Sequence, residues 1–484
     1  MTTSTGRTRI EKDSMGEMEV PAGVLYGAST QRAVLNFPVS GRRVPDDIIM
    51  AYARLKGSAA SVNAALGKLD QARADAIMSA CRQILHGLEE HGGLDANFPV
   101  DIFQTGSGTS TNMNVNEVVA NLVCLTRGAP IGSSKDSAYL EAGGVHPNDH
   151  VNMGQSSNDT FPTAMHVAAA LAIKNDLLPA VGRMAQDLEE KARAWDDVVK
   201  IGRTHLQDAT PIRLGQEFSG YAAQMRHAEE RLHRALHALG ELALGGTAVG
   251  TGINTHPEFG ARVAADLTEQ TEIHFREASN HYEAQHAKDA VVETSGHLKT
   301  IAVSLSKIAG DIRLMGCGPR CGIGELKIPS VQPGSSIMPG KVNPVICESV
   351  VMVCCQVIGN DQAITLGGVG GVGSILDLNV AMPMMAANLL DSIHLLAGAC
   401  RMSCDRLLAG LEPDEERCRS LIEGSLAMCT SLVPAIGYDR SAALAYQAYR
   451  EGKTVREVAL REQVLSAEEL DRLLDPRSMT EPSV

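Results

Sequence analysis

The sequence predicts a mainly α-helical protein built around a central helical bundle, and three observations support this prediction. Hydrophobic residues make up 44% of the 484 residues, which is enough for a sizeable core. Aromatic residues make up only 3%, which argues against a β-sandwich and fits helices packed through smaller side chains. Apolar residues also recur at helical spacing over several long segments. At roughly 150 residues per domain, this length allows about three domains or one large elongated one.

The N-terminal part, residues 1–155, is predicted to form a smaller domain. Glycine and proline cluster there, with short helical segments between them, such as the one from Ile48 to Leu66. A longer helix is predicted to start where Asn158 and Asp159 precede Pro162, because capping residues ahead of a proline in the first turn are typical of a helix start.

The central part, residues 156–408, has the clearest helical periodicity and is predicted to form the bundle. Two stripes step by three and four residues, which keeps apolar side chains on one helix face and favours near-parallel packing. The first comprises Met225, Ala228, Leu232, Ala235, Leu239 and Leu242, and the second comprises Leu298, Ile301, Leu305, Ile308, Ile312 and Met315. A further helix after Pro344 is apolar on most faces, so it is predicted to lie inside a bundle. Such stripes form either the core of one chain or the contact between subunits, and the sequence leaves both open.

The remaining residues, 409–484, predict a small helical C-terminal domain, because the apolar pattern shortens after Glu412 and Pro413. The formal net charge of −14 argues against nucleic-acid binding. Eleven cysteines without a tight framework are typical of a reduced, intracellular protein. Residues 1–10 lack the apolar core of a signal peptide, and apolar runs are interrupted before about 18 residues, so no membrane span is expected.

Four polar, glycine-containing stretches interrupt the predicted helices, and loops of this kind often bind ligands. The first, Thr105–Asn114, offers hydroxyls and backbone N–H groups ahead of a helix, which suits an anion but is also typical of an ordinary helix cap. The second pairs His146–Asp149 with Gln155–Asp159, and it forms either a polar ligand wall or a turn followed by a capping segment.

The third stretch, Gly202–Ala209, places His205 in a loop after a helix, where it is a candidate acid or base, although a lone histidine is more often structural. The fourth, Gly334–Pro344, is predicted to be a loop with a hinge. Its serines and lysine supply a nucleophile or base and a fixed positive charge. Asn343 is predicted to cap the next helix, with Pro344 in its first position. The stretch is neither a nucleophile elbow nor a phosphate-binding loop, and a generic flexible loop is the alternative.

The fourth stretch, GSSIMPGKVN from Gly334 to Asn343, resembles the signature of the fumarase/aspartase superfamily. The other three stretches follow in the order of that family. The resemblance to class II fumarases extends from about Arg9 to the C-terminus, which is nearly all of the chain. His205 favours a fumarase over an aspartase, as do Gly340 ahead of Lys341 and His146.

The resemblance implies a hydro-lyase that reversibly and stereospecifically hydrates fumarate to (S)-malate through an aci-carboxylate intermediate. It implies no metal and no organic cofactor. It also implies a homotetramer with a twenty-helix core, in which three subunits share each active site, and no nucleic-acid or membrane partner. We therefore expect a cytoplasmic enzyme of the tricarboxylic acid cycle.

The resemblance also implies roles for individual residues. Ser335 is the base, on a loop that closes over the substrate, and His205, oriented by Glu348, handles the water. A serine alkoxide requires nearby N–H donors and positive charge. The implied substrate-binding residues are Ser107, Gly108, Thr109, Ser156, Ser157, Asn158, Thr204, Ser336, Lys341, Val342 and Asn343. A second, peripheral dicarboxylate site is implied at His146, Pro147, Asn148 and Asp149.

Three places depart from the family pattern. The run Leu140–Val145 lacks the basic residues that often precede His146, one of which contacts ligand in the peripheral site. The glycine-rich stretch Gly367–Ser374 is longer than usual, and Ala381 and Met382 replace a common aromatic and basic pair.

Three alternatives remain. Cysteine pairs such as Cys317 and Cys321 suggest a metal site, but none forms a convincing C-x-x-C set. The second alternative is another lyase of the superfamily, one that acts on aspartate or a substituted succinate. A non-catalytic structural protein on this scaffold, as some lens crystallins are, is the third, but it would have no physical reason to keep His205, Ser335 and Lys341.

Overall fold

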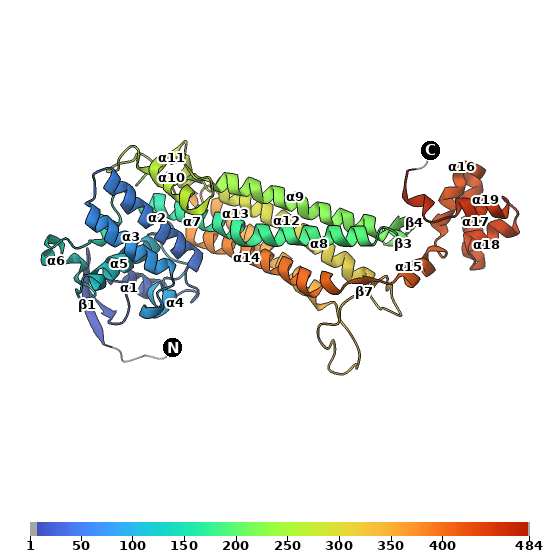
Figure 1. The fold of residues 1–484 in the computed structure, drawn as a ribbon, viewed down its shortest axis with the longest axis horizontal. Helices are drawn as coiled ribbons and strands as arrows, with labels where there is room; N and C mark the ends of the chain where they lie inside the picture. The colour runs from blue at the N-terminus through green and yellow to red at the C-terminus, as the bar shows by residue number, and fades with distance from the viewer. Residues whose placement is uncertain (1–6, 483–484) are drawn as a thin grey trace. The chain divides into compact units, whose positions relative to one another are not determined.

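The computed structural model describes residues 7–482, and these residues are mainly helical, as predicted (Figure 1). They form two compact units whose segments alternate along the chain. The first unit comprises residues 7–178, Glu230–Thr300 and Gln356–Leu396. The second comprises Pro179–Glu229, Ile301–Cys355 and residues 397–482. The division of the chain at 155/156 and 408/409 stays a prediction.

The first unit begins with a β-hairpin and a set of short helices. The strands β1 and β2 pair antiparallel, with Thr8 opposite Pro21. The bounds are β1 Thr8–Asp13, β2 Gly16–Pro21, α1 Ala28–Asn36, α2 Asp46–Ala65, α3 Gln71–Leu85, α4 Gly93–Asn97, α5 Thr109–Thr126 and α6 Ser137–Glu141. The helix predicted over residues 48–66 is therefore confirmed as α2, with small shifts at both ends.

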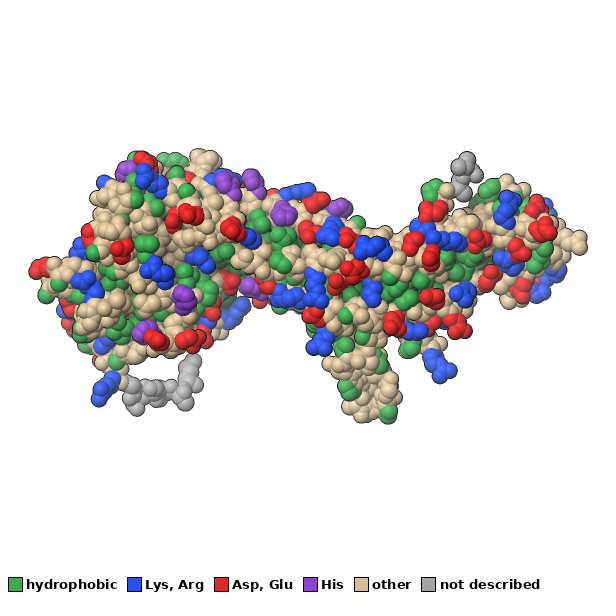
Figure 2. Space-filling view, viewed as in Figure 1, with side chains coloured by type: hydrophobic (Ala, Val, Ile, Leu, Met, Phe, Trp, Pro, Cys, Tyr) green, Lys and Arg blue, Asp and Glu red, His purple; other side chains and the backbone are tan. Residues whose placement is uncertain are grey.

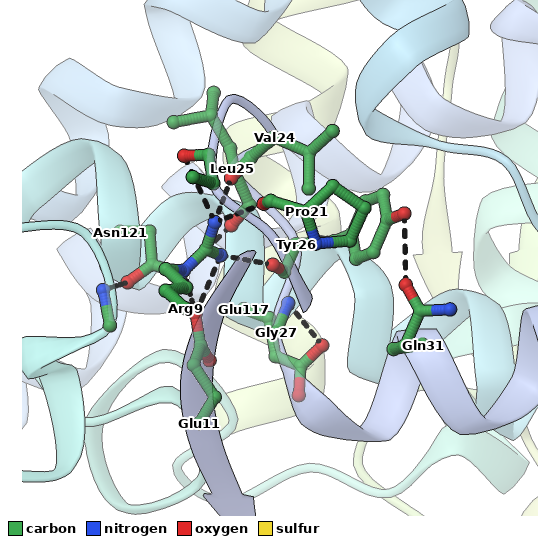
Figure 3. A network of polar contacts seen from close by, with 12 residues as sticks. Arg9, Glu11, Pro21, Val24, Leu25, Tyr26, Gly27, Gln31, Glu117 and Asn121 are labelled. Carbon is green, nitrogen blue, oxygen red and sulfur yellow. Dashed lines mark hydrogen bonds and ion pairs between the residues drawn. The ribbon is translucent and has the colours of Figure 1, made fainter. Parts of the chain in front are cut away.

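A buried carboxylate on α5 holds the start of α1 (Figure 3). Glu117 accepts a hydrogen bond from the backbone N–H of Gly27 (2.9 Å). It also accepts from the backbone N–H (3.1 Å) and the hydroxyl (2.7 Å) of Thr30. This is a charge-assisted helix cap supplied from another element. Arg9 donates to the carbonyl of Tyr26 (2.6 Å) and so ties β1 to the same turn. These contacts fix the chain around α5, the helix that begins in the first polar stretch.

The helix α7, Ser157–Ala172, starts earlier than predicted. Ser156 is its N-cap, and the side chains of Ser156 and Asp159 each accept a hydrogen bond from the other's backbone in a capping box. Pro162 therefore lies inside the helix and not in its first turn, which corrects the prediction. The first unit also contains two π-helical segments and further short elements, which are η3 Pro147–Val151, η4 Ile173–Leu177, β5 Glu241–Leu242, α10 Phe259–Thr271, β6 Arg276–Glu277, α11 His281–His286, β8 Ser374–Ile375 and β9 Leu378–Asn379.

Five long helices dominate the central part of the chain (Figure 1), namely α8 Leu178–Ala194, α9 Leu214–Leu239, α12 Asp289–Met315, α13 Val345–Gly368 and α14 Met382–Arg406. All five contribute residues to both units, α8 through Leu178 alone. Every residue of the two predicted apolar stripes is buried within the single chain. Of the two alternatives that the sequence left open for these stripes, the structure therefore supports the core of one chain.

Helix α13 differs from its prediction. Instead of lying wholly inside a bundle, it leaves Met352 67%, Ile358 37% and Leu366 58% exposed on the single chain. Among the described helices, α13 alone is long and apolar enough to span a membrane by length and composition. The same pattern fits a helix whose outer apolar side packs against another chain. The expectation of no membrane span stays a prediction.

The second unit contains a β-hairpin and a set of C-terminal helices with a small apolar core. Leu432, Leu444, Val458 and Leu470 are among the buried residues of that core. The bounds are β3 Val199–Thr204, β4 Gln207–Arg213, β7 Leu326–Lys327, β10 Glu412–Pro413, α15 Glu415–Ile422, η6 Leu426–Leu432, α16 Val433–Ile436, α17 Tyr438–Glu451, α18 Val455–Arg461 and α19 Ala467–Leu473.

Candidate active site

The first polar stretch forms a tight turn into α5, and two glycines are required there. Gly108 is the N-cap with φ 74°, and a Cβ at this position would lie 1.9 Å from the ring of Phe161. A Cβ at Gly106 would lie 1.7 Å from the carbonyl oxygen of Val380. The backbone N–H of Met382 donates to the Gly106 carbonyl (3.0 Å). The segment that departs from the family pattern at Ala381 and Met382 therefore lies directly against the first stretch.

The first and second stretches meet in a row of three hydroxyls, which we call the hydroxyl row and define as Ser107, Thr109 and Ser157. The Thr109 hydroxyl lies 2.8 Å from that of Ser107 and 2.7 Å from that of Ser157. Thr109 is the first residue of α5, and Ser157 is the first residue of α7. The positive ends of two helix dipoles thus converge on one set of hydroxyls, which is a favourable environment for a carboxylate.

Asp159 fixes the start of α7 to a neighbouring loop. Its carboxylate accepts backbone N–H bonds from Ser156 (2.9 Å), Thr247 (2.9 Å) and Gly245 (3.2 Å). The side chain is fully buried, and burial raises the pKa of Asp159 to about 6, although the backbone donors oppose that shift. Asn158 donates to the carbonyl of Ala248 (2.8 Å) in the same loop.

His205 does not lie in a loop after a helix, as predicted, but in the tight turn of the β3–β4 hairpin. His205 and Leu206 both have positive φ angles, 56° and 60°, which non-glycine residues seldom adopt. The side chains of Thr204 and His205 are exposed. An exposed histidine on a strained turn has no packing role, which favours the acid/base interpretation over the structural one.

A buried ion cluster anchors the base of this hairpin. Arg203 donates to both carboxylate oxygens of Glu325 (2.9 Å each), and Lys200 lies 3.3 Å from the same carboxylate. Glu325 is fully buried, so its charge depends on these two partners. The cluster gives the turn that carries His205 a rigid base.

The fourth stretch is a loop that is closed by its own hydrogen bonds. The Ser335 hydroxyl accepts two backbone N–H bonds, from Ile337 (3.2 Å) and Met338 (3.0 Å). Two donors aimed at one oxygen would stabilise an alkoxide there, and this turn also occurs as a local serine motif. Ser335 is half-buried, whereas Ser336 and Lys341 are exposed and Val342 is 44% exposed.

Asn343 does not cap the following helix, which corrects the prediction. Its side-chain amide donates to the carbonyl of Gly334 (2.6 Å) and joins the two ends of the loop. Helix α13 begins at Val345, so Pro344 precedes its first residue. Glu348 is exposed in the first turn of α13, and no hydrogen bond joins it to His205 within residues 7–482.

The predicted peripheral site has a local structural role as well. His146 is the N-cap of the π-helical segment, where its Nδ1 accepts the backbone N–H groups of Asn148 (3.3 Å) and Asp149 (3.0 Å). Burial lowers the pKa of His146, which agrees with a neutral ring whose Nδ1 is an acceptor. Pro147 is buried, whereas Asn148 and Asp149 are exposed.

A cavity of about 510 Å³ lies beside this segment, and His146 and Asn148 line it. Arg32 and Lys135 line it too. Arg32 pairs with Asp13 (2.7 Å), and Lys135 donates to the carbonyl of Lys12 (2.6 Å). Arg32 and Lys135 therefore supply positive charge to the cavity, although the run Leu140–Val145 lacks the basic residues that are common in the family.

Metal binding receives no support from side-chain clustering. Within residues 7–482, no group of three or more histidine, cysteine or acidic side chains is arranged to hold a metal ion. All eleven cysteines are free, and burial raises the pKa of both Cys354 and Cys400 to about 12, as expected for thiols packed as small apolar groups. The prediction of a cofactor-free enzyme stays a prediction.

Sequence reasoning missed Lys56 and Asn152, two residues that contact each other beside the second stretch. Lys56 on α2 is fully buried and contacts Asn152, which lies between the two halves of the second stretch. A lysine within an apolar helical segment was the available signal, but the sequence does not reveal what such a lysine contacts.

Comparisons with known proteins agree along nearly the whole chain. A family described as "Lyase" matches residues 16–359, and one described as "Fumarase C C-terminus" matches residues 428–481. The "Fumarate hydratase class II" of Corynebacterium glutamicum is 51% identical, over 97% of this chain and 96% of its own length. That of Neisseria meningitidis is 49% identical, over 98% of this chain and 99% of its own.

The chain belongs to the class II fumarate hydratase family. A solved class II fumarase from Schistosoma mansoni, 38% identical, matches this fold with a TM-score of 0.92 and covers 99% of this chain and 100% of its own. A structure described as "fumarate lyase:delta crystallin" from Brucella melitensis, 43% identical, gives a TM-score of 0.91 over 98% of this chain and 100% of its own. The resemblance inferred from the four stretches is confirmed.

Proposed function

We propose that this member of the fumarate hydratase family reversibly hydrates fumarate to (S)-malate. The observation that carries the proposal is the convergence of the N-termini of α5 and α7 on the hydroxyl row, because it creates a neutral but electropositive seat for a carboxylate. Such a seat accommodates an anionic substrate in a chain whose net charge is −14, since local dipoles and donors decide binding at short range.

In the dehydration direction, Ser335 would remove a proton from the carbon beside a carboxylate. The two backbone N–H groups on its oxygen support this role, since they would stabilise the alkoxide. The resulting aci-carboxylate would be stabilised by Lys341, Asn343 and the helix N-termini. His205 would protonate the departing hydroxyl, with Glu348 orienting its ring. Ser156, Asn158, Thr204, Ser336 and Val342 would complete the substrate contacts.

We further propose a homotetramer with active sites shared by three subunits. His205 and Glu348 are both exposed, and no hydrogen bond joins them within the described residues; we propose that they meet across chains. The exposed apolar side chains of α13 would then be covered by neighbouring subunits in the twenty-helix core. Light scattering tests this proposal, and a fully active single chain would contradict it.

The peripheral site and the location remain part of the proposal. His146 and Asn148 would bind a second dicarboxylate, with Arg32 and Lys135 supplying positive charge from the cavity wall. Acidic and basic side chains are interspersed over the face in view (Figure 2), which supports the expectation of no nucleic-acid or membrane partner. We also retain the proposal of a cytoplasmic enzyme.

The activity is tested by following the ultraviolet absorbance of fumarate with purified protein. We expect malate to yield fumarate, and fumarate to be consumed in water without ammonia. Aspartate should yield no fumarate. Turnover of aspartate, or a lack of turnover with malate, would instead support an aspartase-like lyase or a non-catalytic protein.

A further inference from the structure

Lys56 is an unusual residue for the middle of α2. Its side chain is completely buried, between the equally buried Tyr52 and Ala59 on the same helix. A lysine is almost never fully buried unless its charge is paired or hydrogen-bonded, because removing an ammonium from water is costly. Lys56 must therefore obtain its partners from the neighbouring elements.

The partners of Lys56 are two amide side chains in the second polar stretch. Its Nζ donates to Asn152 Oδ1 and to Gln155 Oε1, each at 2.9 Å. Asn152 and Gln155 lie between the π-helical segment and the start of α7, directly ahead of Ser156 and Ser157. The lysine thus holds the short segment that leads into the hydroxyl row.

Asn152 connects the same segment to α5. Its Oδ1 also accepts hydrogen bonds from the side-chain amides of Asn112 (3.1 Å) and Asn116 (3.2 Å), and its own amide donates to the carbonyl of Gln155 (3.0 Å). One side-chain oxygen therefore receives donors from α2 and α5 together. Asn112 lies three residues, or about one helical turn, after Thr109 in the hydroxyl row.

We propose that Lys56 is a positioning residue for substrate binding, which acts through Asn152 and Gln155 to set the spacing between Thr109 and Ser157. The inference rests on the proposed function, because it assumes that the hydroxyl row binds a carboxylate. Lys56 itself does not hydrogen-bond to the hydroxyls of the row within the described chain. Since the row binds substrate and transition state alike, its disturbance affects KM more than kcat.

The main experiment compares Lys56→Met with Lys288→Met in the full-length enzyme. Met has a similar length and no charge. Lys288 is a matched control, because it is also buried in the first unit but donates only to backbone carbonyls at the end of α11, at residues 284, 285 and 287. The readouts are kcat, KM and the inhibition constant of succinate, a dicarboxylate that does not react.

We expect Lys56→Met to raise KM and the succinate inhibition constant by about 10-fold, with a kcat change below about 3-fold. Lys288→Met should leave both binding constants within about 2-fold of the unmodified enzyme. Unchanged KM and inhibition constant in folded Lys56→Met would overturn the inference. If the unmodified enzyme does not hydrate fumarate, the proposed function fails instead, so the two failures are distinguishable.

A second variant covers the case in which Lys56→Met does not fold. Asn116→Ala removes one donor from Asn152 Oδ1 without leaving a buried charge, and the Oδ1 of Asn116 has no hydrogen-bond partner to lose. We expect a smaller rise in KM, of about 2- to 4-fold, with kcat nearly unchanged. A normal KM in this variant, or a loss confined to kcat, would contradict positioning through Asn152.

The pH dependence provides a readout that a purely structural lysine would not change. Burial lowers the pKa of Lys56 to about 7, so the ammonium is lost as the pH rises through that value, and succinate affinity should fall with it. The titratable groups that face Lys56 are Asp159, Cys81 and Tyr52. Burial raises the pKa of Asp159 to about 6 and that of Cys81 to about 12, and it raises the pKa of Tyr52 as well. Cys81 and Tyr52 therefore stay neutral near pH 7, whereas Asp159 and Lys56 titrate there as a coupled pair. Lys56→Met should abolish this step, and its persistence would assign the step to another group.

Discussion

The hydroxyl row and the Ser335 loop differ in how completely one chain builds them. Ser107 is 6% exposed and Ser157 is 9% exposed, and both are hydrogen-bonded to Thr109 between them. Ser336 and Lys341 are exposed, and the loop that carries them is closed only by its own hydrogen bonds. The hydroxyl row is thus preorganised inside one unit, whereas the loop that carries the proposed base presents side chains on the outside of the other.

The two regions differ in how rigidly the fold holds their side chains. The hydroxyl row lies at the starts of two helices, so its geometry depends on packing that persists throughout the fold. The proposed base lies on a loop, an element that moves at low cost, whereas His205 lies on an exposed turn whose strands are anchored by Glu325. Variants of the two regions should therefore separate into effects on binding and effects on turnover.

The largest effect is expected for Ser335→Ala. Without the proposed base, kcat should fall by about 10²- to 10³-fold, while the affinity for succinate changes little because Lys341 and Asn343 remain. Ser336→Ala is the control, and it should weaken binding with a smaller effect on kcat. If Ser336→Ala proves more damaging to kcat, the base has been assigned to the wrong serine.

His205→Asn should lower kcat by about 10²-fold, since general acid–base help is lost. The side chain is exposed on its turn, so the temperature of thermal unfolding should not change measurably. Asn also tolerates the positive φ of this position. Near-normal turnover in a correctly folded variant would transfer the acid/base role to another residue.

On the other side of the comparison, Thr109→Val should raise KM by about 10-fold with kcat within about 3-fold. Valine keeps the shape of threonine but removes the central hydroxyl of the row. Steady-state kinetics and succinate inhibition measure this split. A loss confined to kcat would show that the row acts on the transition state, and the contrast between the two regions would disappear.

The smallest effect is expected from metal removal. Incubation with EDTA should leave kcat and KM unchanged, because both regions work through hydroxyls, amides and backbone donors in the proposed mechanism. Activity that is lost with EDTA and restored by iron or zinc would contradict the cofactor-free prediction for both regions together.

Sequence alone predicted the helical fold class, and it singled out the stretches that contain the hydroxyl row and the Ser335 loop. The stripe from Leu298 to Met315 was predictable because burial on one helix face imposes a period on the sequence. The hairpin turn at His205 was not, because two non-glycine residues with positive φ contain no turn signal.

Two further errors have a common cause. Asn343 was expected to cap a helix, but its amide bonds to a carbonyl nine residues away. The start of α7 was placed too late because Ser156 and Asp159 cap each other. In both cases several polar residues compete for the same backbone groups, and residue type alone does not decide which of them forms the hydrogen bond. The burial of Lys56 was likewise hidden, since it depends on amides about a hundred positions away.

The exposed apolar side of α13 has a consequence for the life of the newly made chain. Met352, Ile358 and Leu366 remain uncovered until something packs against them. Before assembly, these side chains form an exposed apolar surface, which can associate with the correct subunit surface or aggregate with an incorrect one. The refolding yield should therefore pass through an optimum in protein concentration. A low concentration slows the correct association of subunits, and a high concentration increases aggregation.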